Sequence, residues 1–199
     1  MIKNPDKRAW FIWSIAALFY LYELVLRVSP SVMTDGLTKS FGVNATALGI
    51  LVSFYYYAYT ILQLPCGIIL DKLGAKKLLG LSSLLCSIGS VLFALTTNIQ
   101  IAQIGRFLVG AGSACAFISC LQIAANMFPA KYFVILGGAT NMMGTLGGLL
   151  GGYPVAKAVN SIGWQKTSFI LALIGCILCA IIFICFPSDK PQNTQNKNP

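Results

Sequence analysis

Six long stretches almost free of charge constrain this chain more than any other feature. They are residues 9–22 (continuing through a charged pair), 47–70, 78–97, 107–130, 132–156 and 167–188. Each is close to, or above, the roughly 20 apolar residues that a helix needs to cross a bilayer. Lipid offers no hydrogen-bond partners, so a lone strand cannot cross, and a closed barrel would show segments of about 10 residues with alternating polarity. The sequence therefore predicts an all-α membrane protein with six transmembrane helices.

The composition agrees with this class. Of 199 residues, 57% are hydrophobic and only 10% are charged, and the mean hydropathy is +0.77. These values exclude an ordinary soluble globular domain. The formal net charge of +9 would suit a nucleic-acid partner. However, the basic residues are dispersed among short loops rather than clustered, so we predict no nucleic-acid binding.

The distribution of basic residues along the chain predicts its orientation in the membrane. If the N-terminus is cytoplasmic, nine basic residues lie inside and three outside. The inside set is Lys3, Lys7, Arg8, Lys72, Lys76, Lys77, Lys131, Lys190 and Lys197, and the outside set is Lys39, Lys157 and Lys166. Cytoplasmic loops are enriched in Lys and Arg. We therefore expect a multi-pass protein of the plasma membrane, the inner membrane in a bacterium, with both termini cytoplasmic.

Three charged residues remain within the expected helices. Glu23 and Arg27 lie in the first helix, and Arg106 lies near the start of the fourth. Residues four apart share a helix face, so Glu23 can pair directly with Arg27, and Tyr20 shares that face. Charges at bilayer depth are costly and normally face a protein interior or an aqueous cavity. The alternatives are a purely structural ion pair for Glu23 and Arg27, and a snorkelling side chain for Arg106.

Uncharged polar residues mark further candidates for a cavity wall. Tyr55, Tyr59 and Gln63 recur every four residues and form a polar stripe on the second helix. The stripe either lines a cavity or lets the tyrosines hydrogen-bond to neighbouring helices. Asn141 is a polar candidate on the fifth helix. With the three charges and Tyr20, these are the candidate substrate and coupling residues.

The residues that metal and enzyme chemistry require are scarce. The chain has no histidine, and its seven cysteines all fall within apolar stretches. Cysteine in such a setting usually acts as a small packing residue. The few acidic residues form no arrangement of a nucleophile with a base. We therefore predict no metal site, no cofactor and no enzymatic activity.

The segment 67–77 predicts a very tight turn between the second and third helices. It reads Gly67-Ile-Ile-Leu-Asp71-Lys72-Leu-Gly74-Ala-Lys76-Lys77. Glycines permit positive φ and close backbone approach, and Asp71 can accept from helix-terminal amides or pair with a lysine. The segment resembles the loop 2–3 signature of the major facilitator superfamily, although Ala75 replaces a residue that is usually basic. The resemblance implies a loop that gates conformational change, with Gly67, Asp71, Lys72, Gly74, Lys76 and Lys77 as its residues.

Two glycine patterns also resemble this superfamily. Arg106 begins a match to its fourth-helix pattern, Arg-x3-Gly-x-Gly. In the fifth helix, Gly144, Gly148 and Gly152 recur every four residues and predict one small-residue face for close helix contact. That region partly resembles the superfamily's antiporter signature, but Gly148 stands where the signature has proline, so packing is the favoured interpretation. The candidate packing residues are Gly110, Gly112, Gly144, Gly147, Gly148, Gly151 and Gly152.

The resemblance implies half of a major facilitator fold. Six transmembrane helices would form a 3+3 inverted repeat, residues 9–97 and 98–187. A basic cytoplasmic leader at 1–8 would precede them, and a disordered cytoplasmic tail at 188–199 would follow. In the superfamily, helices 1 and 4 line the central cavity, and two six-helix bundles rock about it. Glu23, Arg27 and Arg106 would then surround one substrate path.

The function implied is secondary active or facilitative transport of a small polar organic solute by alternating access. A cavity with both charge signs suits zwitterions such as amino acids or dipeptides, and organic anions come next. Helix 1 also faintly resembles the branch that contains lysosomal dipeptide carriers. Arg27 and Arg106 would hold a carboxylate or phosphate, and Glu23 a cation or a coupling proton. The expected partners are the solute, the lipid bilayer and a second six-helix bundle, from a homodimer or a partner chain. The alternative is a truncated, non-transporting membrane protein or an interaction subunit.

Overall fold

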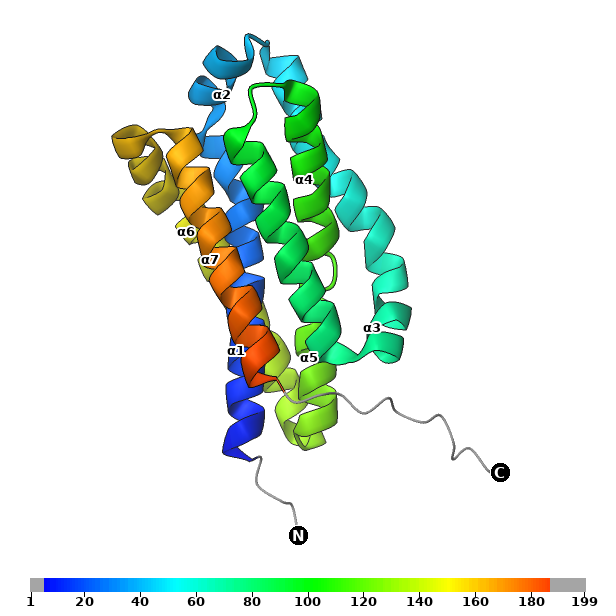
Figure 1. Cartoon of the computed structure of the whole chain (residues 1–199). Coiled ribbons are helices and arrows are strands. Elements are labelled where there is room, and N and C mark those ends of the chain that lie inside the picture. Colours follow the sequence, from blue (N-terminus) through cyan, green and yellow to red (C-terminus); the bar gives the residue numbers. More distant parts are fainter. Residues whose placement is uncertain (1–5, 187–199) are drawn as a thin grey trace.

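The computed structural model describes residues 6–186, and the regular elements in that range are all helices (Figure 1). They are α1 (Lys7–Val28), the 3-10 helix η1 (Ser29–Val32), α2 (Thr34–Phe41), α3 (Ala45–Leu95), α4 (Ile99–Ser113), α5 (Ala116–Met127), α6 (Ala130–Ile162) and α7 (Trp164–Cys185). The all-α prediction is confirmed. The predicted tail at 188–199 and most of the predicted leader at 1–8 lie outside the described residues.

α3 contains two membrane crossings. Five helical stretches of the described chain are long and apolar enough to cross a membrane, and α3 is the longest at 51 residues. A straight helix of that length would extend about 76 Å, well beyond a bilayer of about 40–45 Å. At Gly74 the backbone leaves the helical region, with φ 78° and ψ 161°. The chain turns back there at the lower end of the bundle in Figure 1. The six predicted crossings are therefore present.

Gly74→Ala should destabilise the protein because the backbone at this turn lies in a region that only glycine adopts readily. A side chain held there costs on the order of 1–3 kcal/mol, which lowers the melting temperature by about 2–12 °C in a chain of this size. Thermal unfolding of the purified protein in detergent, followed by circular dichroism, measures the effect. Gly67→Ala is the matched control, since Gly67 has open space around it and no positive φ. Equal melting temperatures for the two variants would contradict a strained turn.

The segment between α1 and α3, which lies outside the six apolar stretches, contains the helix α2. This helix forms because its apolar side chains find cover: Leu37 is buried, as is Met33 just before it. The Trp164 indole at the start of α7 donates a hydrogen bond to Ser40 Oγ at 3.0 Å. α2 then ends at Gly42, whose φ of 63° is the left-handed conformation common after helices.

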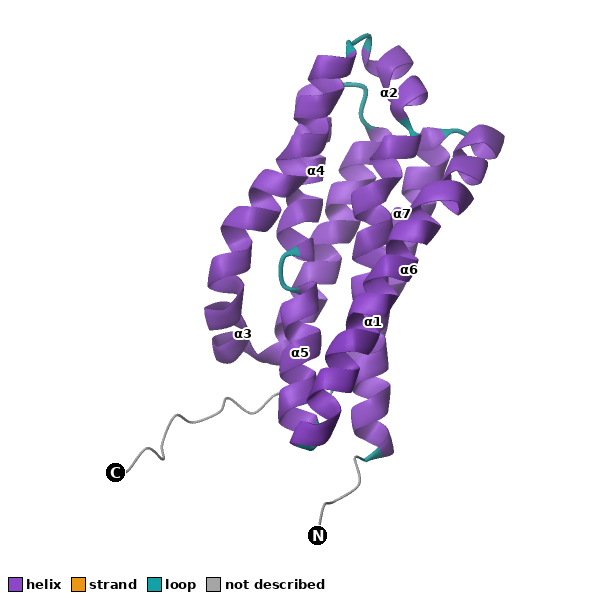
Figure 2. Ribbon diagram, turned by 180° about the vertical axis from the view of Figure 1, so that it is seen from behind, coloured by secondary structure: helices purple, strands orange, loops and turns teal. Residues whose placement is uncertain are grey.

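The fourth crossing, expected to be continuous, is interrupted between α4 and α5. The break covers Ala114 and Cys115 and is visible as the teal loop between these helices in Figure 2. The backbone bonds described here stop on either side of it: the Ala114 amide donates to Gly110 O at 3.2 Å, and the Ser119 amide donates to Cys115 O at 3.0 Å. The break is therefore a local weak point in one crossing. α5 then carries the chain to the lower end of the bundle.

α1 lies at the centre of the bundle, and α6 packs closely against it through glycines. A Cβ on Gly144 would meet the Tyr20 ring, and one on Gly147 or Gly151 would meet the α1 backbone. Gly148 and Gly152 have nothing within 4 Å. The predicted face of 144, 148 and 152 is therefore wrong as the face of α6 that packs against α1. The glycines that contact α1 are 144, 147 and 151. Their spacings of three and four residues average close to the 3.6 residues of one helical turn, so they lie on one face.

Glycines also bring α3 and α4 together. Gly110 lies against the backbone of Tyr55, in the first half of α3, and Gly112 lies against Ser82 and Cys86 in the second half. Close backbone approach at these points leaves no room for a larger residue. This packing places Arg106, one turn before Gly110, beside Tyr55 near the start of α3 and Phe93 near its end. The candidate site forms at that contact.

Candidate functional site

The three intramembrane charges come from two helices and converge on one tyrosine of a third. Tyr55, in α3, is fully buried, and its hydroxyl donates a hydrogen bond to Glu23 Oε2 of α1 at 2.8 Å. The guanidinium carbon of Arg106, from α4, lies 5.0 Å from the centre of the Tyr55 ring. The guanidinium carbon of Arg27, from α1, lies 6.0 Å from the same centre. Tyr55 therefore contacts all three charged groups.

Glu23 and Arg27 do not form the ion pair expected from their spacing. The structure describes no salt bridge between them; Glu23 bonds instead to Tyr55, and its other carboxylate oxygen has no hydrogen-bond partner in the described structure. The Arg27 guanidinium lies over the rings of Tyr56, at 5.1 Å, and Tyr59, at 5.5 Å. An aromatic face attracts a guanidinium, which gives Arg27 an alternative to the carboxylate. Glu23 is fully buried, whereas Arg27 is half-buried.

Arg106 is buried rather than snorkelling, with only 3% of its surface exposed. Its Nη1 donates to Leu26 O at 3.0 Å, while Nε and Nη2 have no partner in the described structure. The side chain lines a cavity of about 10 Å³, room for about one water molecule, together with Leu26, Ser29, Ser90, Phe93, Val109, Ser168 and Leu171. Unpaired guanidinium nitrogens beside serine hydroxyls leave hydrogen-bonding capacity at this point.

The remaining cavity candidates lie in different settings. Tyr59 stacks on Tyr55, with ring centres 5.9 Å apart, so it extends the aromatic surface beneath Arg27. Tyr20 is half-buried and packs on Phe117 of α5 at 5.4 Å. Gln63 is half-buried and Asn141 is exposed on α6. No contact of Asn141 with the charged groups is described, and its role stays a prediction.

The turn at 67–77 is tied to the bundle by side chains that were not expected. Asp71 neither caps a helix nor pairs with a lysine among its described bonds, since its Oδ1 accepts from Gln122 Nε2 of α5 at 2.8 Å. Lys76 Nζ donates to the Phe186 carbonyl, beyond α7, at 2.7 Å. Lys72 and Lys77 are exposed. Gln122 was missed because an isolated glutamine in an apolar helix gives no sequence signal.

A disulfide was also missed. Cys66 of α3 and Cys115 at the α4–α5 break are bonded, 49 residues apart in sequence. The two cysteines lie in separate apolar stretches without any motif, so sequence reasoning assigned them to packing. Their pairing depends on how the two helices are placed.

Tyr55→Phe should destabilise the bundle while keeping the ring that both arginines contact. Without the hydroxyl, Glu23 loses its described hydrogen bond at a site with no solvent exposure. Leaving a buried polar group unsatisfied costs about 1–3 kcal/mol, and more for a charged one. We expect a lower melting temperature in detergent. Tyr57→Phe is the control, because Tyr57 is 56% exposed on the same helix. Equal melting for both variants would show that the Tyr55–Glu23 bond does not stabilise the bundle.

Comparison with known proteins identifies the family of this arrangement. The family model described as Major Facilitator Superfamily matches residues 10–199. The chain belongs to the major facilitator superfamily. The predicted family and half-fold are thereby confirmed, and the chain is an integral multi-pass membrane protein.

Several curated relatives of the chain are transporters from bacteria. The chain is 30% identical to the uncharacterized transporter YybO of Bacillus subtilis, over 88% of this chain and 40% of the relative. It is 28% identical to the hexuronate transporter of Bacillus subtilis, and the match covers 95% of this chain and 44% of that transporter. It is 25% identical to the probable sulfoacetate transporter SauU of Cupriavidus necator, and the match covers 96% of this chain and 44% of that transporter. The chain thus spans less than half the length of these relatives.

A solved structure shows the same fold. A bacterial homologue of the human lysosomal transporter Spinster, in an inward-facing and unoccupied conformation, matches with a TM-score of 0.83. The match covers 98% of this chain and 47% of that chain, at 16% sequence identity. The whole length of the six-helix bundle is therefore arranged as half of a complete member.

Proposed function

We propose that this chain is one six-helix half of a secondary carrier that moves small organic anions across a membrane by alternating access. The observation that carries the proposal is the accessibility of Arg27. Among the three intramembrane charges, Glu23 and Arg106 are buried, at 0% and 3% exposure, while Arg27 is half-buried. The charge that a solute can reach is therefore positive.

This accessibility favours an organic anion over a zwitterion. A zwitterion would need a reachable carboxylate for its ammonium group, and Glu23 is enclosed and bonded to Tyr55. A guanidinium presents parallel donors that match the geometry of a carboxylate or sulfonate. The names of two relatives agree with this class, since hexuronate and sulfoacetate are organic anions.

Glu23 is the group to which we assign the coupling proton. It is the acidic side chain placed among the charged residues, and its Oε1 has no hydrogen-bond partner in the described structure. Tyr55 connects it to both arginines, so a change at Glu23 reaches the anion site through one shared contact. Intramembrane carboxylates serve as proton relays in many carriers.

A working carrier needs a second six-helix bundle, from a second copy or from another chain. The chain covers 40–44% of the relatives named above. Large apolar side chains on α3 and α6 are strongly exposed, with Leu64 at 87%, Tyr153 at 80% and Val134 at 79%. Lipid and a second bundle are the two environments that suit such faces.

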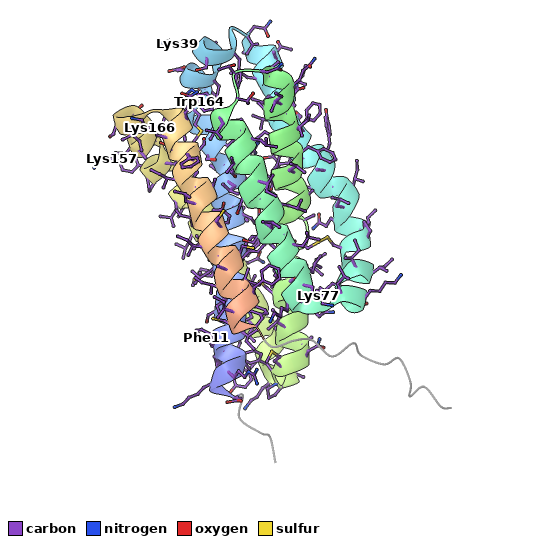
Figure 3. All side chains as sticks on the ribbon, viewed as in Figure 1. Phe11, Lys39, Lys77, Lys157, Trp164 and Lys166 are labelled. Atoms are coloured by element: carbon purple, nitrogen blue, oxygen red, sulfur yellow. A yellow bond between two sulfur atoms is a disulfide. The ribbon has the colours of Figure 1, made fainter. Side chains whose placement is uncertain are left out.

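The orientation proposed from the sequence fits the shape of the bundle. α1 begins and α7 ends at the same end, the lower one in Figure 1. Figure 3 shows Lys39, Lys157 and Lys166 at the upper end and Lys77 toward the lower end. We propose that the lower end faces the cytoplasm of a bacterial cell, in keeping with the positive-inside rule.

Two experiments test this function. Uptake of radiolabelled galacturonate and of a radiolabelled dipeptide is compared in cells with the gene deleted or restored, and we expect restoration of galacturonate uptake only. Restored dipeptide uptake alone would reject the anion assignment.

Crosslinking in native membranes, followed by mass spectrometry, should capture a second copy or another six-helix chain. A protein found only as a monomer, with no uptake, would reject the carrier proposal.

A further inference from the structure

The Cys66–Cys115 disulfide joins two helices where each is weakened. Cys66 follows Pro65, which has no amide hydrogen to donate within α3. Cys115 lies at the break between α4 and α5. The two Cα atoms are 5.5 Å apart, and the bond is visible in yellow between these helices in Figure 3. The cross-link therefore connects two positions at which the helices can bend.

Besides the disulfide, a small apolar cluster and two described side-chain bonds, Lys76 to the Phe186 carbonyl and Gln122 to Asp71, hold this part of α3 to the bundle. The cysteines belong to a small apolar cluster, separate from the main core, with Leu70, Leu78 and Ala114 as its other buried members. The opposite face of the segment is open, since Ile61, Leu64 and Ile68 are 65%, 87% and 62% exposed. The hydrogen bond from Gln122 Nε2 to Asp71 Oδ1 links α3 to α5 at a point five residues beyond Cys66, closer to Gly74. The disulfide is the covalent bond among these contacts, and it joins α3 to the α4–α5 break.

The bond lies beside the signature turn. Cys66 precedes Gly74 by eight residues, about 12 Å along a helix. With the orientation proposed above, this is the cytoplasmic side, where disulfides are usually transient and redox-sensing. The segment that the bond holds, residues 67–77, contains the proposed gating loop. The state of the bond therefore affects the part of the half-bundle that has to move.

We propose that Cys66 and Cys115 form a reversible redox site that fixes the lower half of α3 to the α4–α5 break when oxidised and releases it when reduced. A dithiol reductant attacks one sulfur as thiolate and forms a mixed disulfide, and its second thiol then completes the exchange. The dithiol becomes a disulfide, and the two cysteines each gain one electron and one proton. Oxidation is the reverse exchange: a small-molecule or protein disulfide accepts the two electrons and two protons from Cys66 and Cys115 and leaves as two thiols. Release lets α3 bend at Pro65, carrying the turn away from α5. The effect on transport rests on the proposed function, whereas the redox site does not.

The first test maps the bond in the full chain. Cells are lysed in N-ethylmaleimide to trap free thiols, and the purified protein is digested and analysed by mass spectrometry. We expect a Cys66–Cys115 linked peptide, lost after dithiothreitol, and a higher linked fraction in cells treated with the oxidant diamide. Free Cys176, which is exposed and unpaired in the structure, is the internal control for trapping. Complete alkylation of both Cys66 and Cys115 even after diamide would overturn the proposal.

The second test measures release. Hydrogen exchange of the intact wild-type protein is followed with and without dithiothreitol, which needs no variant that could misfold. We expect exchange in residues 60–77 to accelerate at least about tenfold on reduction, with α7 unchanged. In Cys66→Ser and Cys115→Ser, residues 60–77 should exchange fast without reductant, and dithiothreitol should not change that rate. Cys176→Ser should behave as wild type. A linked peptide with exchange unaffected by reduction would reject the switch and leave a static cross-link. Absence of uptake in every variant would concern the carrier proposal alone.

Discussion

Arg27→Ala should abolish uptake of the organic anion while the protein still reaches the membrane in wild-type amounts. Arg27 is the accessible cation of the site, lying over the rings of Tyr56 and Tyr59 rather than in an ion pair with Glu23. In the proposed complex the Arg27 guanidinium pairs with the anionic group of the solute, and truncating one partner of such an enclosed charge pair costs about 2–5 kcal/mol, a loss of at least about 30-fold. Because no described salt bridge depends on Arg27, the fold should tolerate its loss.

The measurement is initial uptake of labelled galacturonate, normalised to the amount of protein in the membrane fraction. Arg27→Lys separates charge from geometry, because lysine keeps the charge but lacks the planar group that stacks on tyrosine. We expect it to retain a small part of the activity. Lys157→Ala, at an exposed position near the upper end of α6, is the control and should transport normally. Unchanged uptake by Arg27→Ala would remove Arg27 from the site.

Gly147→Val should prevent stable folding, whereas Gly148→Val, one residue further along the same helix, should be tolerated. A Cβ on Gly147 would meet the Leu21 backbone and, at 2.9 Å, the Leu24 Cβ, and backbone atoms cannot move aside as a flexible side chain can. Overpacking of this kind costs about 1–3 kcal/mol and occasionally more, and here the clash is with the backbone of α1. Gly148 has nothing within 4 Å.

Expression and melting temperature in detergent compare the two variants under identical conditions. We expect little or no folded Gly147→Val, and a melting temperature for Gly148→Val close to that of the wild type. The pair controls for helix propensity, since each replaces glycine with valine at neighbouring positions. If Gly148→Val keeps its melting temperature but loses uptake, its face touches the second bundle. If both variants fold equally well, the contact between α6 and α1 is wrong.

Sequence patterns predicted the features that depend on a single helix. The lengths of the apolar stretches predicted six crossings, because the bilayer sets the length of a spanning segment. The glycines of segment 67–77 predicted a tight turn there, because few other residues adopt positive φ, and the structure places this turn at Gly74. Glu23, Arg27 and Arg106 could be predicted to lie in the same half of the membrane from their positions alone.

Features that depend on two helices could not be predicted in the same way. The spacing of Glu23 and Arg27 permits an ion pair. However, Tyr55, which lies on another helix, donates a hydrogen bond to the Glu23 carboxylate. The sequence marked all five glycines between 144 and 152 as packing residues and favoured the face of 144, 148 and 152, whereas the position of α1 selects 144, 147 and 151. In each case the period of the helix defines a set of faces and does not say which face meets a neighbour.

By itself, the sequence determined the class of the protein, the number of its crossings and the position of the turn at Gly74, because solvation by lipid and backbone sterics act on each segment separately. The tertiary structure decided the rest. It placed three charges around Tyr55 and left Arg27 as the accessible one. It also joined Cys66 to Cys115 across 49 residues. These outcomes depend on how close-packed helices fit against each other, and a close fit is a property of pairs of surfaces rather than of any one segment.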